Sequence, residues 1–121
     1  IINQLKESII NILKNNLKSN IFIKDSFVTI FKSGGGVQTH NHMTKFDDLM
    51  KLSCRKFSLV YYLSTGDQNC EEPGILKLYK PDNEILPSDG MIIIFPADRY
   101  HSVIYNGIKD RIIIGINFYT I

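Results

Sequence analysis

The chain has 121 residues, of which 44% are hydrophobic and 21% are charged, with a formal net charge of +2 at pH 7. This composition excludes a disordered chain, and the length suffices for one domain over residues 1–121 with its own hydrophobic core. The charge is small and scattered, with no basic run longer than Arg55-Lys56, so we expect no nucleic-acid partner.

Residues 2–18 are predicted to form an amphipathic helix. Apolar residues recur at three- and four-residue steps, and the other face carries Asn, Gln, Lys and Glu. This stripe is typical of a helix packed on the outside of a sheet, although a partner-binding or membrane-surface helix would also carry one. We expect residues 1–20 to form this outer helix and residues 21–121 to form a β core.

From residue 21 onward the pattern is that of short strands separated by turns. β-branched and aromatic residues dominate the strands, and Gly, Pro, Asn and Asp mark the turns. Asn106-Gly107 indicates a hairpin turn, and residues 43–55 a loop or short helix. The predicted strands are residues 21–23, 27–31, 37–42, 57–63, 74–79, 84–86, 91–95, 100–105 and 111–119. One helix followed by about eight short strands predicts a mainly β fold, a sandwich or jelly roll.

Two further patterns bear on location. The longest apolar runs, such as residues 91–95, are too short to span a membrane, and charges at Lys6 and Glu7 do not fit a secretion signal. Cys54 and Cys70 lack a CxxC spacing and are interpreted as two reduced thiols. We therefore expect a cytoplasmic protein with no membrane partner.

The three histidines of the chain are candidate metal ligands. His40 and His42 follow a glycine-rich turn on a predicted strand, where alternate side chains point to the same face. His101 opens a later strand and can supply a third imidazole. Neutral imidazole binds iron, zinc, copper and nickel. The alternative is that these histidines are structural or line a ligand pocket.

Arg111 follows His101 across the predicted Asn106-Gly107 hairpin, which would place it on the next strand. A guanidinium one strand away from a metal ligand can clamp a carboxylate with two parallel hydrogen bonds. These residues therefore predict a metal beside a site for an acidic small molecule. The alternative for Arg111 is a surface ion pair with Asp98 or Asp110.

The chain resembles the iron(II)- and 2-oxoglutarate-dependent oxygenases, most closely the prolyl-hydroxylase-like branch. The resemblance covers residues 27–119 and rests on the order and spacing of short motifs, namely the histidine pair after the glycine-rich turn and residues 60–63, 74–79, 90–96, 101–103 and 110–118. It implies a double-stranded β-helix, or cupin-like jelly roll, with the N-terminal helix packed outside. It also implies iron(II), 2-oxoglutarate and dioxygen as reaction partners, with ascorbate as a candidate additional reductant.

Carried over residue by residue, the resemblance implies that His40 and His101 bind iron. It further implies that Arg111 holds the distal carboxylate of 2-oxoglutarate and that the Tyr62 phenol hydrogen-bonds to the same carboxylate. One position departs from the pattern, because His42 stands where the family usually has an aspartate or glutamate ligand.

Three interpretations of this departure remain open. His42 is the third ligand, or a loop carboxylate from Asp47 or Asp48 replaces it, or the position is open and the protein is inactive. We favour His42, because the second residue after His40 lies on the correct face of a strand. Asn117 on the last predicted strand could reach the same cavity, or could make only a local hydrogen bond.

The main prediction is therefore a non-haem iron(II) dioxygenase that couples 2-oxoglutarate decarboxylation to hydroxylation. One alternative is a cupin-like three-histidine metal protein that binds or isomerises a small molecule without 2-oxoglutarate. Another is a non-catalytic β-sandwich binding module. Arg111 and Tyr62 discriminate between these, since only the first needs a carboxylate clamp. The substrate stays open: peptidyl prolyl, other peptidyl and small-molecule hydroxylation all fit.

Overall fold

The computed structural model describes residues 2–121, which form two helices and eight strands. Within these residues, neither helix has the length and apolar character needed to cross a membrane. The elements are α1 (Ile2–Leu17), β1 (Ile21–Phe31), β2 (Gly35–His40), α2 (Lys45–Leu49), β3 (Lys56–Ser64), β4 (Leu76–Leu78), β5 (Asn83–Ile85), β6 (Ile92–Pro96), β7 (His101–Tyr105) and β8 (Arg111–Thr120).

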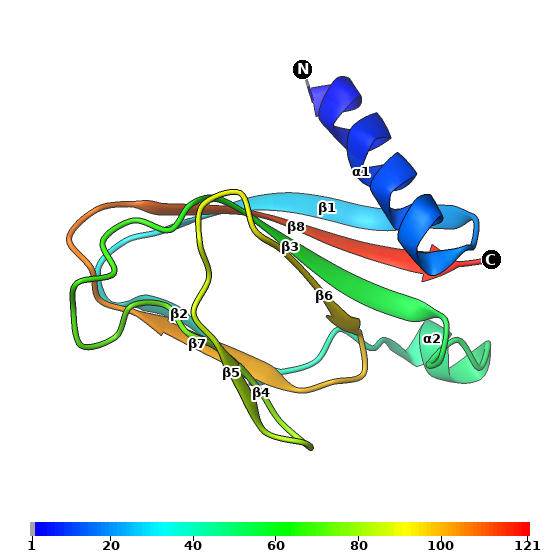
Figure 1. Ribbon diagram of the computed structural model, residues 1–121. Coiled ribbons are helices and arrows are strands. Elements are labelled where there is room, and N and C mark those ends of the chain that lie inside the picture. The colour runs from blue at the N-terminus through cyan, green and yellow to red at the C-terminus, as the bar shows by residue number, and fades with distance from the viewer. Residues whose placement is uncertain (1) are drawn as a thin grey trace.

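The strands form two four-stranded antiparallel sheets that face each other (Figure 1). The first, here called the major sheet, has the order β1-β8-β3-β6, and the second, the minor sheet, has the order β2-β7-β4-β5. The chain passes repeatedly from one sheet to the other, as in a double-stranded β-helix or jelly roll. This confirms the predicted fold class.

β1 is a single strand where two were predicted. Both predicted pieces, residues 21–23 and 27–31, pair with β8, and the register shifts between Ile23 and Asp25. The residues between the pieces are polar and exposed, which an edge strand tolerates because one of its sides faces water. The polar interruption is therefore a β-bulge within the strand.

β7 and β8 do not form the predicted Asn106-Gly107 hairpin. β7 pairs with β2 and β4 in the minor sheet, whereas β8 pairs with β1 and β3 in the major sheet. The connection therefore crosses between the sheets, and Arg111 lies in the sheet opposite His101. A turn dipeptide indicates that the chain reverses, but it does not specify which sheet receives the next strand.

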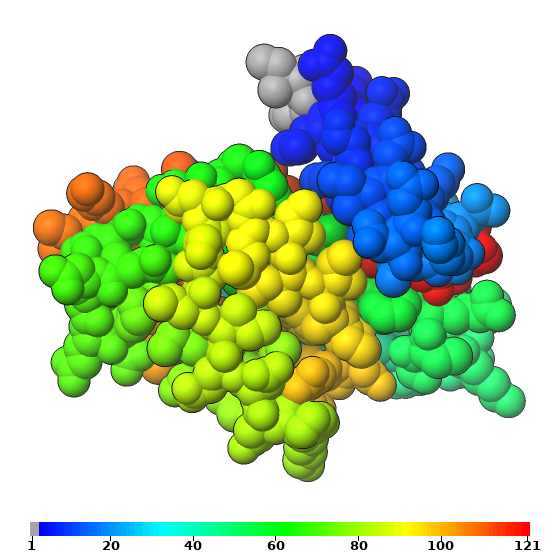
Figure 2. All heavy atoms as spheres, in the orientation of Figure 1, coloured from blue at the N-terminus to red at the C-terminus, as the bar shows by residue number. Residues whose placement is uncertain are grey.

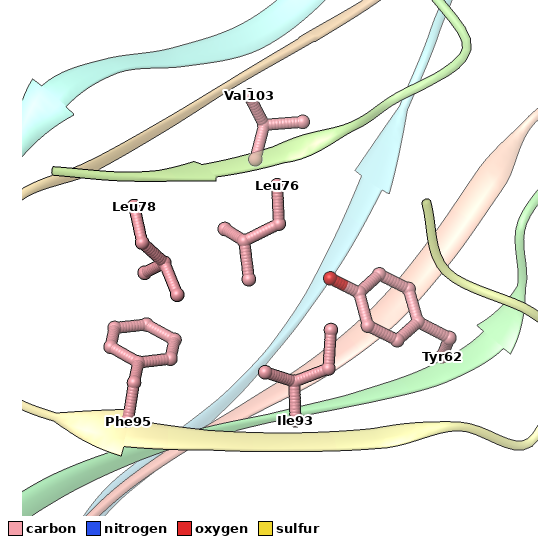
Figure 3. Close-up of a cluster of buried hydrophobic side chains, with 6 residues drawn as sticks. All are labelled: Tyr62, Leu76, Leu78, Ile93, Phe95 and Val103. Atoms are coloured by element: carbon pink, nitrogen blue, oxygen red, sulfur yellow. The ribbon is translucent and has the colours of Figure 1, made fainter. Parts of the chain in front are cut away.

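Apolar side chains from both sheets meet in part of the interior. Figure 3 shows Tyr62, Ile93 and Phe95 from the major sheet directed toward residues of the minor sheet. The buried members of this cluster are Tyr62, Leu76, Leu78, Ile93, Phe95 and Val103. Burying each large apolar side chain stabilises the fold by about 1.5–3 kcal/mol, so this cluster holds the two sheets together.

α1 covers the outer face of the major sheet, as its apolar stripe predicted. Ile9 and Leu13 are buried against Leu59, Ile116 and Phe118. The helix lies over only part of the molecule, and Figure 2 shows its amino-terminal half projecting from the body. Because the helix packs on the outer face, it leaves the space between the sheets free.

Candidate metal centre

The three histidines converge at one end of the space between the sheets. His40 ends β2 and lies directly opposite His101, the first residue of β7. One side-chain nitrogen from each of His40, His42 and His101 falls in a group whose members all lie within 4.8 Å of one another. The shortest approach is 3.2 Å, between the Nε2 atoms of His42 and His101.

His42 reaches this group although it lies just beyond the end of β2. Its backbone N–H donates to the Ala97 carbonyl at 2.9 Å, which ties the segment to the connection after β6. The predicted strand ran to residue 42, but alternation still places the two imidazoles on the same side. Their ring centroids lie 5.0 Å apart.

Two of the three imidazoles, those of His42 and His101, are held in the neutral form that a metal requires. Burial lowers the pKa of His101 to about 4, and burial together with nearby His40 also lowers the pKa of His42. Nδ1 of His40 lies 2.7 Å from the Gln38 carbonyl oxygen, which can only accept, so this Nδ1 carries the proton. The Nε2 lone pair of His40 is then left for a metal.

Asp47 and Asp48, the alternative candidates for the third metal ligand, lie outside the histidine cluster. Asp47 is fully buried and caps α2, accepting from the backbone N–H of Thr44 at 2.9 Å. It also accepts from Lys56 Nζ at 2.8 Å and from the Tyr119 hydroxyl at 2.5 Å. Neither Asp47 nor the exposed Asp48 belongs to the converging ligand group.

The buried ion pair between Lys56 and Asp47 also contacts the backbone of His42. Lys56 Nζ donates to the His42 backbone carbonyl at 2.7 Å as well as to Asp47. Burial opposes ionisation of Asp47, but hydrogen bonds from Lys56, Tyr119 and Thr44 outweigh it and lower the pKa of Asp47 to about 2. The ion pair therefore holds the His42 backbone in place through the hydrogen bond from Lys56 to the His42 carbonyl.

Arg111 lies at the other end of the same space and is 1% exposed. Its Nη1 donates to the carbonyls of Gly74 at 2.8 Å and Pro73 at 3.3 Å, while its Nε has no partner. Among residues 2–121 no carboxylate forms an ion pair with it. A buried charge without an opposite charge is costly, so the guanidinium is poised to bind an anion.

Aromatic rings surround this guanidinium. Its Cζ lies 5.2 Å from the ring centre of Tyr62, 5.8 Å from that of Tyr105 and 5.9 Å from that of Phe31. Tyr62 faces the interior, whereas Tyr61 packs with the α1 cluster on the outer face. Burial raises the pKa of Tyr62, so its hydroxyl keeps its proton and can donate to an anion. Tyr105 was missed in the sequence because nothing local marks it as a neighbour of Arg111.

One cavity of about 220 Å³ joins the two ends. His40, His42 and His101 line it at one end, and Arg111 and Tyr62 line it at the other. Asn117 also lines the cavity, and it makes side-chain hydrogen bonds as well, so it combines the two alternatives left open by the sequence. The arrangement can hold a metal ion at one end and the carboxylate of a small molecule at the other.

The family model described as the 2OG-Fe(II) oxygenase superfamily matches residues 27–119. The chain belongs to this superfamily. The matched segment contains both ends of the cavity, from the β1 residues beside Arg111 to residue 119 in β8. A comparison of the chain with curated proteins gave no significant match.

Solved structures show the same fold. The viral collagen prolyl hydroxylase vCPH from Paramecium Bursaria Chlorella virus-1 aligns with a TM-score of 0.74 and 16% identity, over 98% of this chain and 72% of that one. A Pseudomonas putida prolyl-4-hydroxylase aligns with a TM-score of 0.63 and 17% identity, over 98% and 62%. A 2OG-Fe(II) oxygenase family oxidoreductase from Burkholderia pseudomallei aligns with a TM-score of 0.67 and 16% identity, over 93% and 56%. The chain thus spans less than two thirds of the length of the last two proteins.

Proposed function

We propose that the protein is a non-haem iron(II) dioxygenase that couples the decarboxylation of 2-oxoglutarate to the hydroxylation of a second substrate. Membership of the superfamily supports iron(II), 2-oxoglutarate and dioxygen as its reaction partners. When they are bound, one oxygen atom of dioxygen enters a substrate C–H bond as hydroxyl and the other enters succinate, with release of carbon dioxide.

In this proposal His40, His42 and His101 hold the iron. The three imidazoles converge, and burial lowers the pKa of His42 and His101, so these two present neutral nitrogen donors at physiological pH. His42 takes the place of the family's usual carboxylate, because Asp47 is already engaged by Lys56 and Tyr119. The centre then carries more positive charge than two histidines and a carboxylate would leave.

The observation that carries the proposal is the buried Arg111 without a carboxylate partner, in the cavity that ends at the three histidines. Its guanidinium would hold the distal carboxylate of 2-oxoglutarate, and the Tyr62 hydroxyl would donate to the same group. Planar guanidinium suits this role because it pairs with a carboxylate through two hydrogen bonds. The apolar rings around it exclude water and strengthen the pairing.

Succinate formation in air with iron(II) and 2-oxoglutarate tests this proposal. We expect succinate from the wild-type protein, and we expect Arg111→Met to raise the KM for 2-oxoglutarate at least about 30-fold, because a buried charge pair contributes about 2 kcal/mol or more. Lys109→Met, which removes an exposed cation two residues earlier, is the matched control. Succinate release that Arg111→Met leaves unchanged would contradict the clamp.

A second candidate is a cupin-like three-histidine metal protein that binds or isomerises a small molecule. The all-imidazole donor set favours it, because zinc is commonly held by three histidines. This candidate requires no 2-oxoglutarate. Tight zinc binding together with no succinate formation and no binding of 2-oxoglutarate would support it over the dioxygenase.

A further inference from the structure

A β-bulge turns one acidic side chain of β1, that of Asp25, toward Asn117. Ile23 pairs with Phe118 and packs with the α1 cluster on the outer face, while Asp25 pairs with Asn117, which lines the cavity. Strict alternation would put both Ile23 and Asp25 on the outer face. The extra residue, Lys24, reverses the alternation, and bulges of this kind redirect side chains near functional sites.

Asp25 belongs to a directed row of hydrogen bonds across three strands. The Ser58 hydroxyl donates to Asn117 Oδ1 at 2.8 Å, and Asn117 Nδ2 donates to Asp25 Oδ1 at 2.8 Å. An amide nitrogen only donates and an amide oxygen only accepts, so this pattern fixes the orientation of Asn117. The second N–H of Asn117 and the second oxygen of Asp25 take no part in the row.

This row stands across the cavity from the histidines. Ser58 and Asn117 line the same cavity as His40 and His42. Ser58 pairs with Phe95 of β6, and the Phe95 ring lies 4.9 Å from the His101 ring. Ser58 and Asn117 therefore border the space that a substrate bound beside the histidines would occupy, and Asp25 is hydrogen-bonded to Asn117.

Among residues 2–121, no cation forms an ion pair with Asp25. Residues 2–121 form two ion pairs, Lys32–Asp110 and Lys56–Asp47, and neither includes Asp25. The neighbouring Lys24 is exposed in the bulge. Asp25 is hydrogen-bonded to Asn117, which lines the cavity, so its carboxylate is the group suited to attract a positively charged substrate there.

We propose, on the basis of the proposed function, that Asp25 and Asn117 recognise the second substrate, and that this substrate carries a protonated amine close to the carbon that is hydroxylated. The amine donates to the free oxygen of Asp25, and Asn117 offers its remaining N–H to an acceptor beside it. Ser58 acts through Asn117 and is a positioning residue.

Four small probes test this inference: pentylamine, 1-pentanol, pentanoate and N-acetylprolinamide. Each is added to the protein with iron(II), 2-oxoglutarate and dioxygen, and the rate of succinate formation is measured against probe concentration. We expect pentylamine to stimulate at the lowest concentration. Asp25→Asn keeps the shape and removes the charge, and it should raise the half-maximal pentylamine concentration about tenfold. Asp48→Asn removes a likewise exposed charge outside the cavity and should leave the preference unchanged.

The anaerobic absorption band of the iron(II)–2-oxoglutarate complex distinguishes failure of the proposed function from failure of the amine assignment. If the wild-type protein shows no band, the proposed function is wrong and this inference falls with it. If the band is present but pentylamine is not preferred, or Asp25→Asn keeps the preference, the amine assignment alone is wrong. Preferential stimulation by N-acetylprolinamide would replace the amine with a neutral prolyl substrate.

Discussion

The backbone of Gly74 and the guanidinium of Arg111 are in direct contact. The Gly74 carbonyl accepts from Arg111 Nη1 at 2.8 Å, and a Cβ on residue 74 would overlap the same nitrogen. Gly74 also has a positive φ of +86°. Glycine at this position therefore makes room for the arginine as well as permitting the backbone conformation.

Gly74→Ala should displace Arg111 and weaken 2-oxoglutarate binding. Gly90→Ala is a matched control, because Gly90 has a φ of +83° and a Cβ added there would have no neighbour within 4 Å. Both variants should lose about 1–2 kcal/mol of stability from the left-handed backbone, measured by urea denaturation. Only Gly74→Ala should also raise the KM for 2-oxoglutarate, about tenfold or more. Equal KM values in the two variants would contradict the contact.

The role of His42 can be tested by restoring the family's usual ligand. His42→Asp adds a negative charge to a centre that has three neutral donors, so it should bind iron(II) at least as tightly as the wild type. His42→Ala removes a ligand and should weaken iron(II) binding about 100-fold or more, by comparison with the 10–100-fold effects of outer-shell changes. Calorimetric titration measures both. Iron(II) affinity unaffected by His42→Ala would exclude His42 as a ligand.

Lys56 should affect both stability and metal binding. Lys56→Met leaves Asp47 buried without its partner, which should cost about 3–5 kcal/mol of unfolding free energy. The double variant Asp47→Asn, Lys56→Met should recover part of this stability but should still bind iron(II) about 10–100-fold more weakly, because the His42 carbonyl has lost its donor. Lys45→Met on the exposed face of α2 is the control. A double variant with wild-type affinity would show that the pair serves stability alone.

Asp47 also predicts a specific acid sensitivity. Its pKa in the folded protein is about 2, below its ordinary value of 3.8, so its contribution to stability is present above about pH 4 and is lost as the pH falls toward 2. The loss should be about 2 kcal/mol, from the size of the shift. Urea denaturation of the metal-free protein between pH 5 and 2 measures it. Asp47→Asn should lack this component, and an unchanged pH dependence in that variant would assign the acid sensitivity to other groups.

Local patterns predicted the elements of the fold but not how they pair. Periodicity located α1 to within one residue at its carboxyl end, and strand patterns located β3 and β8. The Asn106-Gly107 turn was wrongly interpreted as a hairpin, since sheet membership depends on packing that no dipeptide encodes. The polar residues between the two predicted pieces of β1 were wrongly interpreted as a strand end, because pairing with β8 continues through the bulge.

The site was predictable where the residue type alone carries the chemistry. Histidine spacing indicated the metal end, and pairing of β2 with β7 then brought His40 and His101 together. The roles of Lys56 and Asp25 can be identified only from the three-dimensional structure. Lys56 supports His42 from fourteen residues away, and Asp25 faces Asn117 only because a bulge reverses the alternation of β1.

The most direct test of the dioxygenase proposal is an anaerobic titration of 2-oxoglutarate into the protein loaded with iron(II), followed by visible absorption. Chelation of the metal by the cosubstrate gives a weak charge-transfer band, and Arg111 in its observed place should make this band saturate at low cosubstrate concentration. We predict a saturating band in the wild type and a midpoint at least about 30-fold higher in Arg111→Met. The absence of any band, together with tight zinc binding, would contradict the proposal.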